Sequence, residues 1–447
     1  MVHRRAAYAG NTKRDGLEGG TAAMSKATDG SPPSGFREQI EAQGVPLPKR
    51  AAFGLLSLLV AAAIWLPALH WAFKPRLSQC LSASTVSPRA QALAAQHFAL
   101  WNAPALRAVE INKMRASNAE WDFMGRTFFV MALGNMALRD PARAGACLDV
   151  MDAVIDETIK LDRTEGPYFF LMSYARNRAF VEQPPRSLFV DGEIALMLGV
   201  RRLVEEKESY KPLLAARVQA IFERMNAGPI LCAESYPDEC WTFCNTAALA
   251  SLRIADALDG SDHREFFKRW VQSARKELID PKTGLLVSSF GLNGARSSGP
   301  KGSTIWMAAH CLQLIDEEFA ADQYRRARKE LGRELLGFGY SRECPISQVE
   351  ISDIDSGPVI PYLNASTSAS GLAVMGAAAF GDRDYFAALC TSLDFAGFPV
   401  ERKGRLKYCA SNQVGDAVLL YAMVLGPAWE KVKASKYAAP AEEAKTP

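Results

Sequence analysis

The sequence has little net charge and few of the patterns by which proteins hold nucleic acids or metals. Its 447 residues include 52 Lys and Arg against 49 Asp and Glu, a net charge of +3. Arginine-rich stretches and zinc-finger spacings are absent, so we expect no nucleic-acid partner. CxxC pairs are also absent, and no histidine accompanies the cysteines of residues 232–244, which argues against a metal site. With 49% apolar and 23% charged residues, the composition is that of a globular protein.

Charge is also missing from one long segment near the N-terminus. Ala51 to Phe73 contains no charged residue. A helix of this length is about 34 Å long at about 1.5 Å per residue, enough to cross a hydrocarbon core of about 30 Å. We therefore predict that residues 51–73 form a single-pass anchor in contact with membrane lipid. Basic residues are more numerous before the span than after it, which favours a domain on the extracytoplasmic, periplasmic side. The polar residues 1–50, rich in Gly and Pro, are predicted to be a disordered tail.

Beyond residue 85 the hydrophobic pattern is helical and repeats. Residues 211–225 carry one apolar stripe among charged residues, as a surface helix does, whereas residues 187–200 are apolar on nearly every side. The alternation of a buried and an amphipathic helix recurs about every 60 residues. It gives six pairs, each with the buried helix first: 119–137 and 141–159, 187–200 and 211–225, 241–257 and 263–278, 302–314 and 316–334, 366–380 and 382–393, 413–424 and 427–435.

Six such pairs predict a closed ring. The expected fold class is all-α, an (α/α)6 toroid of six inner and six outer helices over residues 85–436, with a disordered tail at 437–447. An open solenoid of the same pairs is the alternative. The connections from an outer helix to the next inner helix are long, and in a ring they all lie at the N-termini of the inner helices. We expect the functional site at that end, where the positive ends of six helix dipoles meet.

Carboxylates at this end are the first candidates for chemistry. Asp191 and Glu193 lie about 200° apart on a helix, so at most one of them faces the interior of the ring. The loop sequence DIDSGP carries Asp353 and Asp355, and Asp238 precedes an inner helix. Two carboxyl groups with separated pKa values can serve as acid and base. Ion pairing with nearby arginines is the alternative.

The segment CAESYPDECWTFCN, residues 232–245, is the densest group of reactive side chains. Cys240 and Cys244 lie one helical turn apart, and a thiol at a helix N-terminus can act as an acid or a nucleophile. Disulfide pairing among the loop cysteines at 232, 240, 344 and 409 is an alternative. His310 could form the floor of a cavity or belong to the core. The predicted catalytic residues are thus Asp238, Cys244, Asp191, Asp355 and His310, and the predicted substrate-binding residues are Trp241, Asn245, Trp306, Tyr236, Glu193, Asp353 and Tyr408.

Two of these segments resemble a known family. The run YPDECWTFCN is similar to the cysteine-bearing segment of the linalool dehydratase/isomerase family of (α/α)6 proteins, and DIDSGPVIPYLNASTSASGLAVMGAAAFGD resembles a segment of membrane-anchored bacterial proteins of this toroid type. The resemblance implies that two cysteines, an acid and a histidine move a hydroxyl group and a proton on a small terpene alcohol, without metal or cofactor. Cys244, followed by Asn245, matches the second cysteine. The first falls on Ser235, unless Cys240 or Cys232 supplies it.

These observations favour an enzyme and leave its reaction open. The leading hypothesis is a cofactor-independent lyase or isomerase with dehydratase-like acid and base chemistry on a small hydroxylated substrate. The second is a carbohydrate-active enzyme in which tryptophans stack on a glycan and a carboxylate pair acts on it. The third is a non-catalytic scaffold that binds a glycan or a peptide at the loop-rich end.

Overall fold

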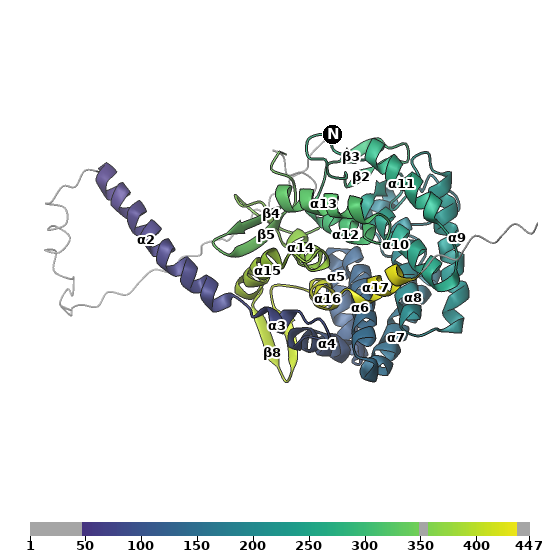
Figure 1. The fold of residues 1–447 in the computed structure, drawn as a ribbon, viewed down its shortest axis with the longest axis horizontal. Coiled ribbons are helices and arrows are strands. Elements are labelled where there is room, and N and C mark those ends of the chain that lie inside the picture. Colours follow the sequence, from purple (N-terminus) through teal and green to yellow (C-terminus); the bar gives the residue numbers. More distant parts are fainter. Residues whose placement is uncertain (1–46, 348–355, 436–447) are drawn as a thin grey trace, which may run out of the picture. The chain divides into compact units, whose positions relative to one another are not determined.

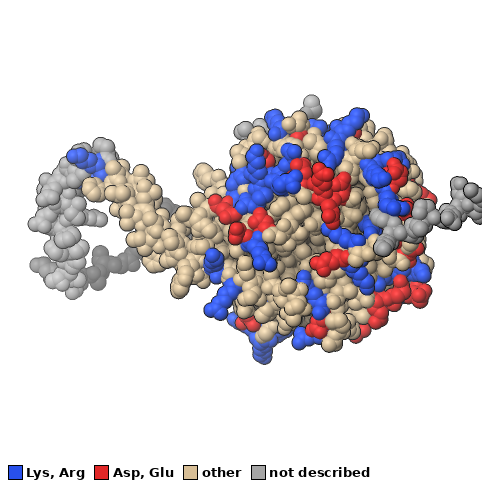
Figure 2. Space-filling model, viewed as in Figure 1, with Lys and Arg blue, Asp and Glu red and all other residues tan. Residues whose placement is uncertain are grey.

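The computed structural model describes residues 47–347 and 356–435, and it divides the chain into two compact units, Met1–Ala63 and Ile64–Pro447. The predicted tails therefore lie outside the described residues, apart from Leu47 to Arg50, which begin the first helix. That helix, α2 (Leu47–Phe73), includes a stretch, Lys49–Phe73, that is long and apolar enough to cross a membrane, with a mean hydropathy of 2.2. Beyond its first turn it carries no charged side chains (Figure 2). The helix is compatible with the predicted anchor.

Six apolar helices form the inner wall of a closed ring. Each of them contacts the next, and the last contacts the first, so the ring closes (Figure 1). Nearly all of their side chains are buried because they are covered by neighbours on both sides and by the outer layer. The inner helices are α6 (Ala119–Arg139), α8 (Leu188–Val204), α10 (Thr242–Asp259), α12 (Gly302–Leu312), α14 (Thr367–Ala379) and α16 (Gln413–Val424). The predicted (α/α)6 toroid is confirmed.

Amphipathic helices form the outer layer. Residues 264–277 show why: Phe266, Phe267 and Trp270 share the buried stripe, whereas the other faces are charged. The outer helices are α4 (Pro88–Trp101), α7 (Ala144–Glu165), α9 (Lys211–Ala227), α11 (Arg264–Glu277), α13 (Glu317–Glu330) and α15 (Arg383–Ala396). Two shorter helices, α3 (Leu77–Cys80) and α5 (Pro104–Ser117), flank α4, and three 3-10 turns precede longer elements at Pro141–Arg143, Ser173–Asn177 and Glu208–Tyr210.

One helix of the predicted outer layer has a different place. We expected residues 427–435 to cover α16 from outside, but α4 packs there, and α17 (Pro427–Ala434) contacts α6, α8 and α10. Its side chain Trp429 stacks on His310 of α12 with ring centroids 4.7 Å apart. Figure 1 looks down the ring and shows α17 across its centre. The helix thus plugs the end of the ring opposite to the N-termini of the inner helices.

Short strands occupy the long connections. A three-stranded sheet joins β1 (Cys240–Trp241), β2 (Ser289–Phe290) and β3 (Arg296–Ser298). A four-stranded antiparallel sheet has the order β4 (Gly332–Leu335), β5 (Phe338–Arg342), β7 (Ala365–Ser366) and β6 (Val359–Ile360), with Ser341 opposite Ser366. A hairpin joins β8 (Pro399–Arg402) to β9 (Arg405–Tyr408). These strands, which the helical pattern did not predict, precede the inner helices and help to build the walls of the site.

Candidate functional site

A cavity of about 620 Å³ opens at the N-terminal end of the ring. The first or second turns of all six inner helices contribute to its wall, because the inner helices point their N-termini to the same end. Most of the exposed surface of its wall is apolar, and Ser and Thr side chains also border it, mainly from α12, α14 and the segments just before α14 and α16. Its lining residues include Glu120, Trp121, Tyr236, Trp241, Cys244, Lys301, Ser303, Glu343 and Gly371.

Glu120 and Tyr236 form one polar group on this wall. Glu120 lies in the first turn of α6, and the Tyr236 hydroxyl, from the loop before α10, donates a hydrogen bond to its carboxylate. The same hydroxyl accepts a hydrogen bond from the backbone N–H of Met172 at 2.9 Å. Burial raises the pKa of Tyr236 well above its ordinary value, and the carboxylate of Glu120 adds to that rise. Tyr236 therefore stays a phenol, and its proton is shared with Glu120.

Cys244 lies at the start of α10, where it faces the cavity from a buried position. Burial raises the pKa of its thiol well above 9.0, so the thiol is protonated at neutral pH. A hydrogen bond joins Cys244 to the hydroxyl of Ser235. Ser235 is the position that the family resemblance assigns to a first cysteine, and the fold does bring the two side chains together.

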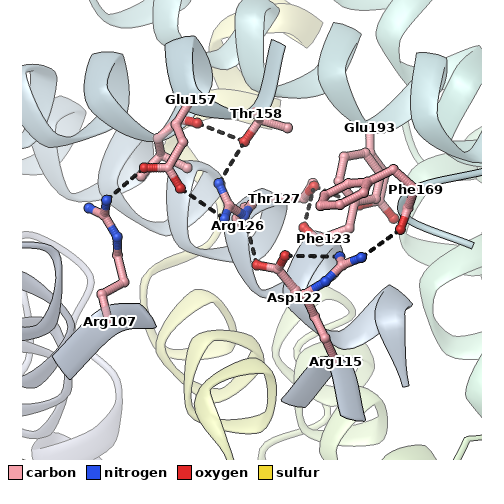
Figure 3. Close-up of polar contacts among 11 residues, drawn as sticks. Arg107, Arg115, Asp122, Phe123, Arg126, Thr127, Glu157, Thr158, Phe169 and Glu193 are labelled. Atoms are coloured by element: carbon pink, nitrogen blue, oxygen red, sulfur yellow. Dashed lines mark hydrogen bonds and ion pairs between the residues drawn. The ribbon is translucent and has the colours of Figure 1, made fainter. Parts of the chain in front are cut away.

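Glu193 lies behind this group rather than on the cavity wall. It is fully buried on α8 and accepts a hydrogen bond from Thr127 Oγ1 at 2.6 Å (Figure 3). Burial raises the pKa of Glu193 from 4.5 to about 8. The ionised form of Glu193 would also raise the pKa of the Cys244 thiol, which shows that the two groups are electrostatically coupled. A neutral carboxyl group thus supports the cavity at this point.

Glu343 supplies a second carboxyl group to the cavity. It follows β5, and its Oε1 accepts a hydrogen bond from the hydroxyl of Ser303 in the first turn of α12. Its other oxygen, Oε2, is buried without a hydrogen-bond partner. Burial raises the pKa of Glu343, opposed in part by the hydroxyl groups of Ser303 and Ser366 and by the charge of Lys301. A buried carboxyl group with one unused oxygen can hold a proton for a ligand.

Trp241 provides another unused polar atom. Its side chain lines the cavity, and its indole Nε1–H is buried without a partner. The ammonium group of Lys301 lies 5.5 Å from the centre of its ring. Buried polar groups in folded proteins are nearly always paired, so an unpaired donor and an unpaired acceptor in one cavity indicate a ligand with a polar group.

The predicted site residues divide into those that reach the cavity and those that do not. Tyr236, Trp241 and Cys244 line it. Asp191 does not, because Arg186 and Arg217 pair with it; Arg186 Nε donates to its Oδ2 at 2.7 Å. For Asp191 the structure thus shows the ion pairing with arginine that was the alternative to acid or base chemistry.

Asp238 also lies away from the cavity. It is exposed in a turn with φ of 58°, and its nearest cation is Arg178, at 3.7 Å. The backbone conformation and the exposure fit a turn residue, so a catalytic role is better assigned elsewhere. Asp353 and Asp355 lie outside the described residues.

Four further candidates belong to the core. His310 Nε2 lies 2.7 Å from the hydroxyl of Tyr421, and burial lowers the pKa of His310 to about 4. Trp306 donates to Ser341 Oγ at 2.9 Å. Asn245 holds backbone groups of Ala233 and Trp241, and Tyr408 is buried beside Asp394. These side chains shape the surroundings of the cavity without lining it.

Asp122, another acidic residue near the mouth, is held in an arginine network. Arg126 Nε donates to its Oδ1 at 2.8 Å, and Arg115 lies 3.3 Å from its Oδ2 (Figure 3). Arg126 also pairs with Glu157, which in turn binds Arg107. The network joins α5, α6 and α7 and leaves Asp122 fully paired.

All nine cysteines lie within the described residues, and each has a free thiol, so the structure contains none of the disulfides considered above.

Sequence reasoning missed Glu120 and Glu343, the carboxyl groups that line the cavity within the described part of the chain. Glu120 occupies the first turn of a helix, where an acidic residue is equally expected for its interaction with the helix dipole. Glu343 lies in an irregular segment after a strand, where no periodicity shows which way a side chain points. Its place in the long connection before an uncharged inner helix was the available signal, as it was for DIDSGP.

Comparison with known proteins agrees with the resemblance noted above. The model of the linalool dehydratase/isomerase family matches residues 194–414, slightly less than half of the chain. A GH76 alpha-mannanase from Bacteroides thetaiotaomicron is 12% identical, with a TM-score of 0.43 over 69% of this chain and 87% of the other. An unsaturated glucuronyl hydrolase from Bacillus sp. GL1 is 14% identical, with a TM-score of 0.44 over 66% and 84%. Both scores are low, so the closed ring rests on the helix contacts described above.

Proposed function

From the match of residues 194–414 to the linalool dehydratase/isomerase family, we propose that this protein is an (α/α)6 enzyme that removes or moves a hydroxyl group on a small, largely apolar alcohol. The family match and the ring support an (α/α)6 enzyme. The finer proposal concerns the reaction, which we assign to acid and base chemistry by side chains of the cavity.

One observation carries the proposal. The cavity is mostly apolar, yet Glu343 Oε2 and Trp241 Nε1 are buried at its wall without partners. A sugar would need many polar partners, whereas an alcohol with an apolar skeleton needs only a few. A substrate hydroxyl group can accept a hydrogen bond from an indole N–H or from a protonated carboxyl group.

The proposed reaction uses one carboxyl group of the cavity as an acid and the other as a base. Glu343, whose pKa is raised, donates its proton to the substrate hydroxyl, the C–O bond breaks, and water leaves. The carboxylate of Glu120, hydrogen-bonded to Tyr236, accepts a proton from a neighbouring carbon, and its electron pair forms the C=C bond. Exchange with solvent returns the proton to Glu343. Cys244 is a neutral thiol beside this path and donates a hydrogen bond to the departing oxygen.

Product analysis tests the proposal. The full-length protein in lipid nanodiscs is incubated with linalool and a panel of primary and tertiary allylic alcohols, and alkenes and isomeric alcohols are identified by gas chromatography with mass spectrometry. We expect turnover of at least one alcohol, and we expect the double variant Glu120→Gln/Glu343→Gln to abolish it. Equal product from the double variant would exclude these carboxyl groups from the reaction.

A carbohydrate-active enzyme is the second candidate, because the same cavity presents two tryptophans and two carboxyl groups. Trp121 and Trp241 line it together with Glu120 and Glu343, and stacking tryptophans with a carboxylate pair suit glycan cleavage. The same double variant discriminates the two reactions when oligosaccharides are added to the panel. Release of reducing sugar, with no product from any alcohol, would favour this reading.

A further inference from the structure

A group of exposed apolar side chains lies at one edge of the ring, which we call the apolar edge: Leu335, Leu336, Phe395, Phe398 and Val400. They come from the β4–β5 hairpin, the end of α15 and the start of the β8–β9 hairpin. Leu336 is 56% exposed and Phe398 65% exposed. Exposed apolar groups of this kind on a folded domain mark a surface that contacts a partner or a membrane.

The backbone at two of these residues makes their apolar character more unusual. Leu336 has φ of 51° and Phe398 has φ of 50°. Bulky residues are rare in this left-handed region, and turns of this kind favour Gly, Asn or Asp. Both positions therefore combine backbone strain with an exposed apolar side chain. Neither property stabilises the domain in water, so the side chains have a role outside the core.

The apolar edge lies next to the end of α2. The last ten residues of α2 belong to the same compact unit as the ring. Within that unit, the ring of Phe73 lies 5.3 Å from that of Phe395, and the ring of His70 lies 6.0 Å from that of Phe338 in β5. Residues that touch the last turn of a membrane-spanning helix lie at the depth of that turn, which is the lipid interface.

The chain between the span and the core is too short to hold the ring away from the membrane. Cys80 is fully buried in the domain, seven residues after Phe73. Even fully extended, seven residues reach only about 25 Å.

Lys and Arg gather at the tip of the β8–β9 hairpin (Figure 2), where Arg402, Lys403 and Arg405 are exposed. Anionic lipid headgroups attract such a cluster by about 1 kcal/mol per basic residue.

The cavity wall reaches this edge. Gly339, Ala396 and Gly397 line the cavity. Gly339 follows Phe338, and Ala396 and Gly397 lie between Phe395 and Phe398 in the chain. Leu389 and Leu393 on α15 extend the lining toward them. Gly371 of α14 borders the cavity, and a Cβ atom at this position would meet open space. The lining of the cavity thus extends to residues that are neighbours of the apolar edge in the chain.

We propose that the apolar edge lies in the lipid interface of the membrane that α2 spans, and that the cavity takes an amphipathic, lipid-dissolved alcohol directly from the bilayer. The first part stands on the edge and its contacts alone. The second part rests on the proposed function, and it narrows the substrate class to alcohols that partition into membranes.

Cys409 offers a test of the first part. It is the exposed one of the nine cysteines, and its backbone N–H donates to the carbonyl oxygen of Phe398 at 3.2 Å. We would attach a nitroxide to Cys409 of the full-length protein in nanodiscs of phosphatidylcholine and phosphatidylglycerol. The control is Cys409→Ser/Val109→Cys, because Val109 is also exposed, on α5. We expect lipid-soluble oxygen to relax the label at 409 and a water-soluble nickel complex to relax the label at 109.

A second pair of variants separates lipid contact from simple burial of the label. Leu336→Glu/Phe398→Glu is expected to shift the label at Cys409 toward the nickel complex, whereas Leu106→Glu/Val109→Glu on α5 leaves it unchanged. Circular dichroism confirms the fold of each variant. Equal nickel accessibility at positions 409 and 109 would overturn the membrane contact, and this result is independent of any catalytic activity.

Crosslinking tests the second part. A long-chain alcohol that bears a diazirine is added to the same nanodiscs, irradiated, and located by mass spectrometry of peptides. We expect crosslinks in residues 366–374 and 389–397 that unlabelled 1-dodecanol suppresses and that Gly371→Leu reduces. Crosslinks confined to α2 would refute access from the bilayer. Crosslinks at the cavity without turnover would instead refute the proposed chemistry, so the two failures are distinguishable.

Discussion

Replacement of Glu193 by Gln is expected to stabilise the protein at neutral pH. Glu193 is fully buried and accepts its hydrogen bond from Thr127 Oγ1, a bond that the amide oxygen of Gln can also accept. Burial raises the pKa of Glu193 from 4.5 to about 8. The folded protein therefore holds a proton on this residue that the unfolded chain releases at neutral pH.

The sign and size follow from proton linkage. Because the pKa is raised in the folded state, the contribution of Glu193 to stability is fully present below about pH 4.5 and is lost as the pH rises toward 8. At about 1.4 kcal/mol per pKa unit, the loss reaches about 3 kcal/mol at pH 7 and about 5 kcal/mol above pH 8. Gln does not titrate. Glu193→Gln should thus match the wild type at pH 4.5 and exceed it by about 3 kcal/mol at pH 7.

Urea unfolding of the full-length protein in detergent micelles, followed by tryptophan fluorescence, measures this difference. Asp416, whose burial raises its pKa to about 7, titrates in the same direction, and the buried histidines 97 and 310, with pKa values near 4, titrate in the opposite one. These contributions cancel between variant and wild type. Glu318→Gln, at an exposed carboxylate of α13, is the matched control and should show little change. A difference for Glu193→Gln that does not vary with pH would refute the reasoning.

Three further variants test the cavity and its support. Gly371→Leu should fill part of the cavity and raise KM at least tenfold for the substrate alcohol, whereas Gly145→Leu, at an equally open helix position on the surface of α7, should leave KM unchanged. An unaltered KM for both would contradict the assignment of this cavity as the substrate site. Cys244→Ala should lower kcat on the order of a hundredfold, because it removes a hydrogen-bond donor, whereas Cys244→Ser should stay closer to the wild type. Equal kcat values for the two variants in steady-state kinetics would show that the thiol only fills space. Trp429→Ala should destabilise the protein by about 3 to 5 kcal/mol in urea unfolding, because it removes the stacking partner of a buried histidine, and a loss under 1 kcal/mol would contradict the role of α17 as a plug.

The ring could be predicted because burial on all sides leaves a direct trace in sequence. The inner helices at 302–312 and 367–379 contain no charged residue, and the outer helix between them, α13, is amphipathic. The place of α17 could not be predicted, because an amphipathic helix of eight residues fits an outer wall and an end plug equally well. Periodicity shows that a face is buried and does not show what covers it.

The site could be predicted in position more than in detail. The long connections predicted the end of the ring at which the cavity lies. The dense segment 232–245 predicted three of its lining residues, Tyr236, Trp241 and Cys244. The roles of the carboxylates did not follow, because an acidic residue near a helix start serves equally as a cap, an ion-pair partner or a catalytic group. Asp191 is paired with arginine, whereas Glu343 keeps an oxygen unpaired, and only the three-dimensional arrangement distinguishes them.

The central claim is that Glu343 acts as the acid on an alcohol in this cavity, and the turnover of Glu343→Gln tests it most directly. The measurement compares kcat for the first alcohol found to react, in nanodiscs, between the wild type, Glu343→Gln and the surface control Glu318→Gln. Loss of a general acid predicts a decrease of about 10²-fold to 10⁴-fold for Glu343→Gln alone. A kcat for Glu343→Gln equal to that of the control would contradict the account.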